Sequence, residues 1–171
     1  VAVNGVCLTV DKLFTNAFKA VAMPETVEKT NLSSLRVSSH VNLELPLSVG
    51  GKFDGHFVSG HVDGIGTVLR KEMTRHGMTV TILFPPEIAK FLALKGSVTI
   101  NGVSLTILDL QVDTFSVGLI PITQKETNLG MLKENDIVNV EVDLISRYLD
   151  RLLQGREQET SFEWLSDRNL I

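Results

Sequence analysis

The stretch VAVNGVCLTV at residues 1–10 recurs almost unchanged as VTINGVSLTI at residues 98–107. Val1 therefore aligns with Val98, an offset of 97 residues, and the alignment continues in this register without a gap. Near its end, VNLE at residues 41–44 still matches VNVE at residues 138–141. A match of this length in constant register indicates a duplicated domain.

The duplication predicts the domain boundaries. We place the remainder of the first copy at residues 1–50, the second copy at residues 51–143, and a C-terminal helix with its tail at residues 144–171. The stretch that opens the second copy, from about Phe53, has no counterpart at the start of the first. We therefore expect the first copy to lack its opening segment, so that the chain starts inside a domain.

Each copy carries the signature of a β-hairpin followed by an amphipathic strand. Asn4-Gly5 and Asn101-Gly102 supply the two positive-φ residues that a tight type I′ turn needs. After the first turn apolar residues alternate with Cys7 and Thr9, and the second copy repeats the alternation around Ser104 and Thr106. The sequence therefore predicts an all-β fold, with one closed or nearly closed barrel per copy, since closure leaves few exposed strand edges.

Further elements follow from periodicity and from turn and cap residues. We expect strands at residues 64–68, 78–83 and 114–117, with a turn at residues 75–77. We expect short helices at residues 86–94 and 145–153, the second with an apolar stripe formed by Ile145, Tyr148, Leu149, Leu152 and Leu153. The polar tail beyond Gln154 is expected to be loose.

Composition excludes several functional classes. The 171 residues carry 20 acidic and 16 basic side chains, a net charge of −4 with no basic cluster, which argues against nucleic acid as a partner. Cys7 is the single cysteine, so an internal disulfide is excluded and a reducing, cytoplasmic location is expected. No apolar run approaches the roughly 18 residues that span a bilayer, so no membrane partner is expected.

Three sets of motifs carry a family resemblance. They are the paired NG-x-[CS]-LT segments, the two P-x-T turns that are each followed by T-N-L, and GHFVSGHVD at residues 55–63. In order, spacing and duplication they resemble the riboflavin synthase family. The resemblance implies two tandem six-stranded Greek-key β-barrels, the first incomplete at its N-terminus, and a C-terminal helix through which the chain forms a homotrimer.

The resemblance also implies a transferase activity. Family members dismutate two molecules of 6,7-dimethyl-8-ribityllumazine, moving a four-carbon unit from one to the other to give riboflavin and 5-amino-6-ribitylamino-pyrimidinedione. They need neither a metal nor an organic cofactor. The two lumazines lie between the first barrel of one subunit and the second barrel of its neighbour, and lumazine synthase is a candidate protein partner.

Site residues transfer from the family motif position by position. The first-barrel substrate site should comprise Cys7, Leu8, Thr9, Val21, Ala22, Met23, Pro24, Glu25, Thr26, Gly60, His61 and Val62. The second-barrel site should comprise Lys95, Ser104, Leu105, Thr106, Gly118, Leu119, Ile120, Pro121, Ile122 and Thr123. The internal offset carries Cys7 onto Ser104 independently of the family, but it sets Ile122 against Glu25, so the two sites should differ in polar contacts.

Four of these residues are candidates for catalysis. His61 is the first, because imidazole both accepts and donates a proton near neutral pH; the alternative is a histidine fixed for backbone reasons. Cys7 could add to one substrate ring or place water there, or it could be a small packing residue that touches the ligand. Ser104 and Thr106 could bind ring or ribityl groups, or they could belong to an ordinary polar strand face.

Structural roles are also weighed for three further residues. Lys95 could reach the ribityl chain or stabilise a helix C-terminus. Asp143 could support proton transfer or cap the helix that follows it. His56 is interpreted as structural, because two histidines five positions apart are poor evidence for a metal site.

Two other functional classes compete with the enzyme. Lumazine proteins are non-catalytic antennas of the same fold, but they tend to lose ligand residues in one barrel, whereas Ser104, Thr106, Pro121 and Thr123 all persist here. A flavin-dependent oxidoreductase is disfavoured because no G-x-G-x-x-G fingerprint follows a strand. The sequence thus favours the synthase, with the antenna as the alternative.

Overall fold

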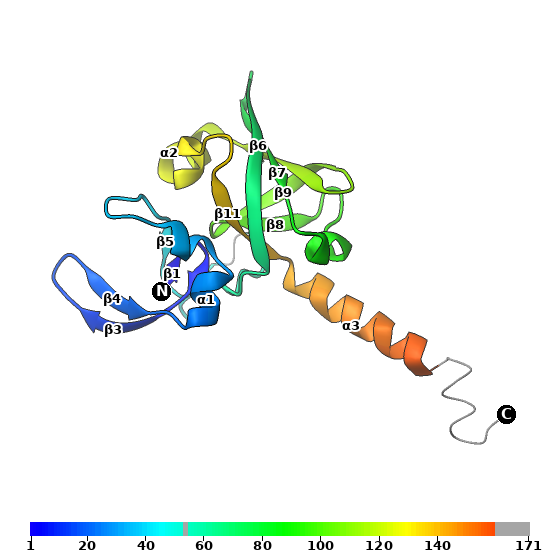
Figure 1. Ribbon diagram of the computed structural model, residues 1–171, viewed down its shortest axis with the longest axis horizontal. Coiled ribbons are helices and arrows are strands. Elements are labelled where there is room, and N and C mark those ends of the chain that lie inside the picture. Colours follow the sequence, from blue (N-terminus) through cyan, green and yellow to red (C-terminus); the bar gives the residue numbers. More distant parts are fainter. Residues whose placement is uncertain (53–54, 160–171) are drawn as a thin grey trace.

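The second copy forms a closed antiparallel barrel. The computed structural model describes residues 1–52 and 55–159 (Figure 1). Its barrel runs in the strand order β10-β7-β6-β11-β8-β9. These strands are β6 (Gly64–Thr74), β7 (Gly77–Leu83), β8 (Ser97–Ile100), β9 (Val103–Leu110), β10 (Thr114–Leu119) and β11 (Ile137–Val142). The expected all-β class is confirmed, as are the strands and the turn before Gly77.

Alternation along the strands fills the barrel. Met78, Val80 and Ile82 of β7 point inward and are almost fully buried, while the residues between them are partly exposed. Phe115 of β10 stacks on Phe84 with ring centroids 5.7 Å apart. Because each buried side chain of this size contributes about 1.5–3 kcal/mol, the second copy has a hydrophobic core of its own.

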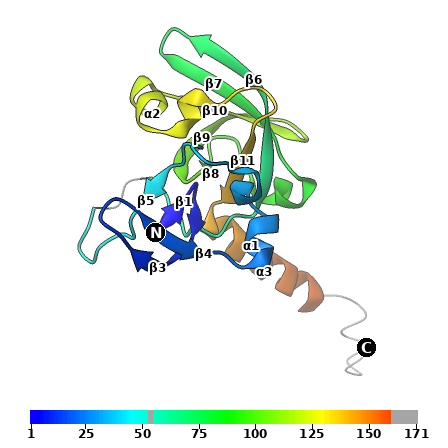
Figure 2. The same ribbon diagram turned by 60° about the vertical axis from the view of Figure 1, so that its left-hand side comes forward.

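The first copy does not close in the described part of the chain. It forms one sheet in the order β2-β1-β5 and a separate pair β3-β4. These strands are β1 (Ala2–Val3), β2 (Val6–Cys7), β3 (Thr9–Leu13), β4 (Phe18–Val21) and β5 (Leu43–Glu44). The single strand β9 of the second copy corresponds to two strands here, interrupted at Leu8. Figure 2 shows these sheets beside the barrel.

Short helices replace the two predicted P-x-T turns. Each turn is instead a brief α-helix with proline in its first turn, and each T-N-L segment is a 3-10 helix capped by its threonine. They are α1 (Pro24–Glu28), η1 (Asn31–Ser34), α2 (Pro121–Glu126) and η3 (Asn128–Met131). The helix expected at residues 86–94 is the 3-10 helix η2 (Pro86–Phe91), which ends earlier.

The two predicted hairpin turns meet back to back where the copies join. Asn4 and Gly5 have φ values of 47° and 75°, and Asn101 and Gly102 have 48° and 85°, as type I′ turns require. A Cβ added to Gly5 would lie 2.6 Å from the backbone nitrogen of Gly102. Only glycine therefore allows the two turns to approach this closely.

A lattice of six asparagines surrounds these turns. Asn31 Nδ2 donates to Asn101 Oδ1 at 3.1 Å, and the equivalent Asn128 Nδ2 donates to Asn4 Oδ1 at 3.0 Å. The backbone N–H of Asn31 donates to Asn139 Oδ1, and that of Asn128 to Asn42 Oδ1, both at 2.7 Å. Its members form three pairs at the repeat offset: Asn4 and Asn101, Asn31 and Asn128, Asn42 and Asn139. The copies are thus joined by reciprocal, twofold-like hydrogen bonds.

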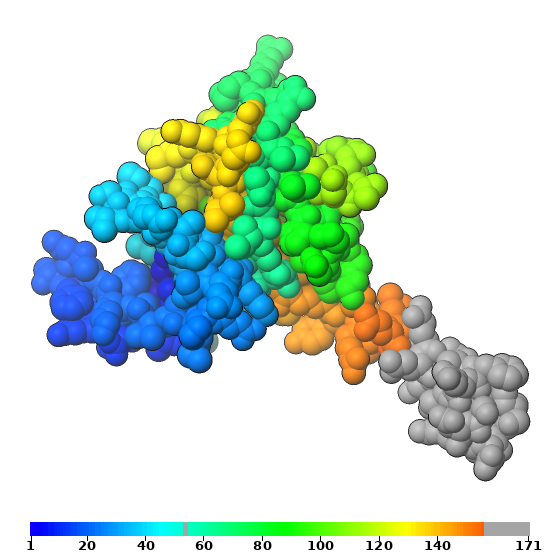
Figure 3. Space-filling view, viewed as in Figure 1, coloured from blue at the N-terminus to red at the C-terminus, as the bar shows by residue number. Residues whose placement is uncertain are grey.

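Helix α3 (Leu144–Glu159) projects from the barrel (Figure 3). Asp143 Oδ1 accepts a hydrogen bond from the N–H of Ile145 at 3.0 Å, which confirms the capping interpretation of Asp143. The helix continues past Gln154, so the loose tail expected from there was wrong as far as Glu159; the rest of that tail lies outside the described residues. The predicted apolar stripe is exposed, and no described helix is long and apolar enough to cross a membrane.

Candidate functional site

The second-copy candidates lie on the outer face of the barrel. Along β9, Leu105 and Ile107 point into the core, so Ser104 and Thr106 point outward; Ser104 is half-buried and Thr106 is exposed. Ile107 pairs with Val117 of β10, which brings the outward Gly118 to the same region. Alternation therefore selects which candidates can touch a ligand, and Leu105 and Leu119 face the core instead.

The remaining second-copy candidates flank this face. Ile120, Pro121 and Ile122 are exposed where β10 passes into α2, and Thr123 is half-buried. Lys95 lies in a turn with φ of 63°, and its N–H donates to the carbonyl of Ile107 at 2.9 Å. Because η2 already ends at Phe91, the alternative in which Lys95 stabilises a helix C-terminus is wrong.

The first-copy candidates form an equivalent but more open face. Cys7 is exposed at the end of β2, and Thr9 of β3 pairs directly with Val21 of β4. The chain continues from Val21 through the exposed Met23 into α1. Of the other candidates, Leu8, Ala22 and Thr26 are half-buried, whereas Pro24 and Glu25 are exposed. The repeat therefore places residues 7–9 and 21–26 of the first copy at positions that correspond to residues 104–106 and 118–123 of the second.

The segment at residues 55–60 contacts Cys7 on the first-copy face and Ser104 on the second-copy face. The carbonyl of Gly60 accepts a hydrogen bond from the N–H of Cys7 at 2.9 Å, and a Cβ on Gly60 would lie 2.7 Å from Cys7 Cβ. A Cβ on Gly55 would lie 2.6 Å from Ser104 Oγ. Both glycines have positive φ, 84° for Gly55 and 78° for Gly60. Residues 55–60 thus run from one copy's candidate face to the other's.

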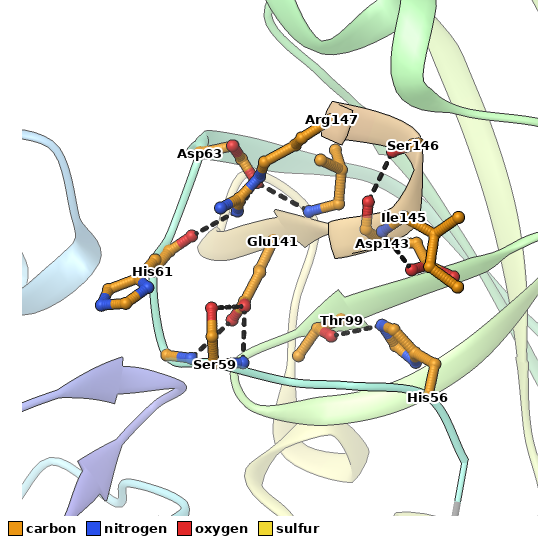
Figure 4. Close-up of polar contacts among 12 residues, drawn as sticks. His56, Ser59, His61, Asp63, Thr99, Glu141, Asp143, Ile145, Ser146 and Arg147 are labelled. Carbon is orange, nitrogen blue, oxygen red and sulfur yellow. Dashed lines mark hydrogen bonds and ion pairs between the residues drawn. The ribbon is translucent and has the colours of Figure 1, made fainter. Parts of the chain in front are cut away.

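His56 is bound into the second-copy face, which the sequence interpretation missed. Its Nδ1 lies 2.7 Å from Ser104 Oγ. Its Nε2 lies 3.0 Å from Thr99 Oγ1, as Figure 4 shows. Burial lowers the pKa of His56, although the negative charges of Asp143 and Glu141 oppose the shift. The signal was the GHFVSGH motif, in which His56 was interpreted as structural without a partner being named for its ring.

The imidazole ring of His61 makes no hydrogen bond within the described part of the chain. The residue is exposed, and its backbone carbonyl accepts a hydrogen bond from Arg147 Nη2 at 2.8 Å (Figure 4). Gly60 places it directly after the contact with Cys7, and the half-buried Val62 follows. The geometry leaves the imidazole available to a ligand on the first-copy face, with no hydrogen bond to Cys7 among the described residues.

The two sites differ at the start of their short helices. Glu25 of α1 forms an exposed ion pair with Lys29 at 2.7 Å, and this hydrogen bond and charge lower the pKa of the Glu25 carboxyl. The second copy has Ile122 and Glu126 at the equivalent positions. The expected departure from symmetry is therefore a charged pair in one copy and an apolar residue in the other.

A hollow of about 390 Å³ lies elsewhere, between the two copies. It is lined in part by Asn42, Asn101 and Asn128, members of the asparagine lattice, and by Lys125 and Glu126. None of the candidate site residues lines this hollow, so it lies apart from both candidate faces.

Comparison with known proteins agrees with the duplication. The family model described as lumazine binding domain matches residues 1–46 and 59–143. Riboflavin synthase of Bacillus subtilis is 44% identical over 161 residues, which cover 94% of this chain and 75% of that protein. Riboflavin synthase of Actinobacillus pleuropneumoniae is 42% identical over 153 residues, covering 90% of this chain and 71% of that protein.

Solved structures show the same fold. The crystal structure of LumP complexed with riboflavin has a TM-score of 0.76 at 27% identity and covers 82% of this chain and 76% of its own. LumP complexed with 6,7-dimethyl-8-(1'-D-ribityl) lumazine has a TM-score of 0.74 at 26% identity, with coverages of 82% and 75%. Taken with the much higher identity to the synthases, these matches show that the chain belongs to the riboflavin synthase family.

Proposed function

We propose that this chain catalyses the dismutation of two 6,7-dimethyl-8-ribityllumazine molecules to riboflavin and 5-amino-6-ribitylamino-pyrimidinedione. One lumazine gives up a four-carbon unit and becomes the pyrimidinedione, and the other accepts the unit and becomes riboflavin. The observation that carries this function is the duplicated candidate face, with Cys7 and Thr9 on one copy and Ser104 and Thr106 on the other. Two equivalent faces suit a reaction between two identical molecules.

Orientation supplies much of the catalysis in this proposal. Holding two reactants in attack geometry can contribute about 7–11 kcal/mol to the barrier. The outward hydroxyls of Ser104 and Thr106 and the thiol of Cys7 would contact the ligands at equivalent places. The short helices that start at Pro24 and Pro121 would border the ligands at the other side of each face.

His61 is the proposed proton carrier. The 7-methyl group of the lumazine is acidic because the heterocycle delocalises the carbanion, so the reaction needs a base that can return the proton later. The His61 ring is exposed and makes no hydrogen bond among the described residues, which leaves both nitrogens for this task. Cys7 would contact the ligand or place the water that adds to it.

Assembly through α3 belongs to the same proposal. The stripe formed by Ile145, Tyr148, Leu149, Leu152 and Leu153 is 55–66% exposed. Monomeric proteins rarely leave a contiguous apolar surface of this kind in water. We propose that it packs in a cytoplasmic homotrimer, with each reaction centre between the first copy of one subunit and the second copy of its neighbour. Leu149→Glu should then convert a trimer into monomers in light scattering.

Lumazine synthase is a proposed partner, because it would supply the substrate where it is consumed. Co-sedimentation of the two purified enzymes tests the association, and sedimentation as separate species would end that part of the proposal.

A non-catalytic antenna is the second candidate. The fold similarity to LumP, whose structures hold a lumazine or riboflavin, favours it. Such a protein would bind lumazine and return it unchanged. The retained Ser104 and Thr106 of the second copy favour the enzyme.

One assay separates the two functions. The protein is incubated with 6,7-dimethyl-8-ribityllumazine, and riboflavin and remaining lumazine are quantified by chromatography over time. The enzyme predicts one riboflavin formed for every two lumazines lost. Tight lumazine binding with no riboflavin formed would instead establish the antenna.

A further inference from the structure

The segment that carries His61 is held from both sides by the end of the barrel. On one side, the buried carboxylate of Glu141 in β11 accepts hydrogen bonds from Ser59 N (2.8 Å), Ser59 Oγ (2.7 Å) and Gly60 N (3.0 Å). On the other, the N–H of Asp63 donates to the carbonyl of Val140 at 2.9 Å. His61 therefore lies between two fixed points.

Arg147, in the first turn of α3, makes the contact to His61 itself. Its Nη2 donates to the His61 carbonyl at 2.8 Å and to Asp63 Oδ2 at 2.7 Å (Figure 4). The same Asp63 oxygen accepts from the N–H of Val142 at 2.7 Å. The Arg147 and Asp63 side chains are only 26% and 18% exposed, so the ion pair is largely shielded from water. Helix α3, strand β11 and the His61 peptide thus share one charged junction.

Helix stability does not explain an arginine at this position. A cation in the first turn is opposed by the positive end of the helix dipole. In addition, Arg147 Nε is buried without a hydrogen-bond partner in the described chain, which costs free energy. The bonds to His61 and Asp63 offset both the unfavourable helix dipole and the unpaired Nε. Arg147 is therefore better explained by a role in placing the His61 segment.

We propose that Arg147 is a positioning residue that sets where the His61 imidazole lies relative to the first-copy face, and that Asp63 orients Arg147. The proposal rests on the proposed function, in which His61 transfers a proton. Because Arg147 joins helix α3 to the His61 carbonyl, a shift of α3 would also move His61. A partner that binds to α3 would therefore change the position of the His61 imidazole at the first-copy face. Glu141 holds Ser59 and Gly60 in place, so the segment would turn about this fixed end.

The test compares three variants of the whole chain. Arg147→Met removes the donors while keeping an extended side chain. Arg147→Lys keeps one charged nitrogen, which can replace both bonds because Nη2 makes both. Arg151→Met, one turn along the helix at an exposed position, is the matched control. Measurements are kcat and KM for riboflavin formation, the Tm, and the Cε1–H signal of His61 in proton NMR, assigned with His61→Gln.

Arg147→Met should lower kcat about tenfold or more, with KM changed less than about threefold, because misplacement acts on the reacting geometry. Arg147→Lys should recover most of kcat, and Arg151→Met should match wild type. The His61 signal should shift in Arg147→Met and not in Arg151→Met. An unshifted His61 signal with kcat within about twofold of wild type would overturn the proposal.

Failure of the proposed function has a different outcome. If wild-type protein forms no riboflavin, the enzymatic proposal fails, while the NMR comparison still decides whether Arg147 positions His61.

Discussion

The two copies have nearly the same hairpin sequence but different surroundings, and burial follows the surroundings. Ile107 in β9 is fully buried inside the closed barrel, whereas its equivalent Val10 is 40% exposed in the two-stranded sheet. Leu110 is half-buried, while its equivalent Leu13 is 78% exposed. A local strand signal therefore predicts the conformation of the backbone, but only barrel closure turns an apolar strand face into a core.

The features that the copies keep in common are those that do not need closure. Both Asn-Gly turns form, both short helix pairs form, and the asparagine lattice uses equivalent residues from each copy. Backbone turn chemistry and reciprocal hydrogen bonds are satisfied locally or across the junction. This difference between core and junction can be tested by paired substitutions.

The largest effect is expected for the aromatic pair Phe115 and Phe18, which are equivalent by the repeat. Phe115 is 1% exposed and stacks on Phe84, whereas Phe18 is only half-buried. Phe115→Ala should lower the free energy of unfolding by about 3–5 kcal/mol, and Phe18→Ala by about 1 kcal/mol, in urea titrations. Equal losses would contradict the conclusion that, within residues 1–52 and 55–159, the closed core belongs to the second copy.

The second largest loss of stability is expected for substitutions in the asparagine lattice. Asn139→Ala removes an acceptor for the Asn31 N–H and a donor to the Asn4 carbonyl at 2.8 Å, and both groups are buried. The cost should be about 2–3 kcal/mol, because buried polar groups lose their partners. The equivalent Asn42→Ala, at a half-buried position, should cost about 1 kcal/mol. Urea titration of both variants measures the difference, and a larger loss in Asn42→Ala would refute the account of the junction.

A pH-dependent effect is expected at His56, which covers Ser104 in the second copy while Cys7 stays exposed in the first. Burial lowers the pKa of His56 in the folded chain, whereas in the unfolded chain it titrates near the usual 6.5. As the pH falls from 7.5 to 5.5 the unfolded chain binds the proton first, so folding loses stability.

His56→Gln should remove this part of the pH dependence, because glutamine can still bond to Ser104 and Thr99 without titrating. The stability gap between wild type and His56→Gln should therefore narrow on acidification. His76→Gln, in the exposed turn before β7, is the control and should leave the wild-type pH profile unchanged. A gap that is the same at both pH values would show that His56 is not buried as described.

The smallest effect is expected at the asymmetric ion pair. Glu25 and Lys29 are both exposed, so their attraction is screened by water and salt. Glu25→Gln should leave the Tm unchanged within error and weaken lumazine binding only to the first copy, the copy that has the acid. A change in binding to the second copy instead would reverse the assignment of the two sites.

Much of the fold was predictable because its signals are local. The offset between residues 1–10 and 98–107 predicted the duplication, and Asn-Gly predicted both turns. The break at Leu8 was not predictable, since the equivalent Leu105 lies within a continuous strand. Leu8 and Leu105 have nearly the same neighbours in sequence, VCLTV and VSLTI, so we attribute the difference to the barrel around one of them.

The candidate site was predicted less completely, because its contacts join distant residues. Alternation predicted correctly that Ser104 and Thr106 share the strand face opposite the apolar residues, but it could not show that His56 bonds to Ser104 across 48 positions. The asparagine pairs and the Arg147 junction likewise depend on partners more than 60 residues apart. In the sequence, Asn139 resembles an ordinary strand residue and Arg147 an ordinary residue at the start of a helix.

In the proposed function, the two copies present two equivalent ligand faces on one chain. The most direct test counts bound ligand, by titrating the protein with a non-reactive lumazine analogue and following fluorescence. The account predicts two ligands per chain, with Cys7→Trp blocking one and Ser104→Trp blocking the other. Binding of a single ligand per chain, unaffected by one of these substitutions, would contradict it.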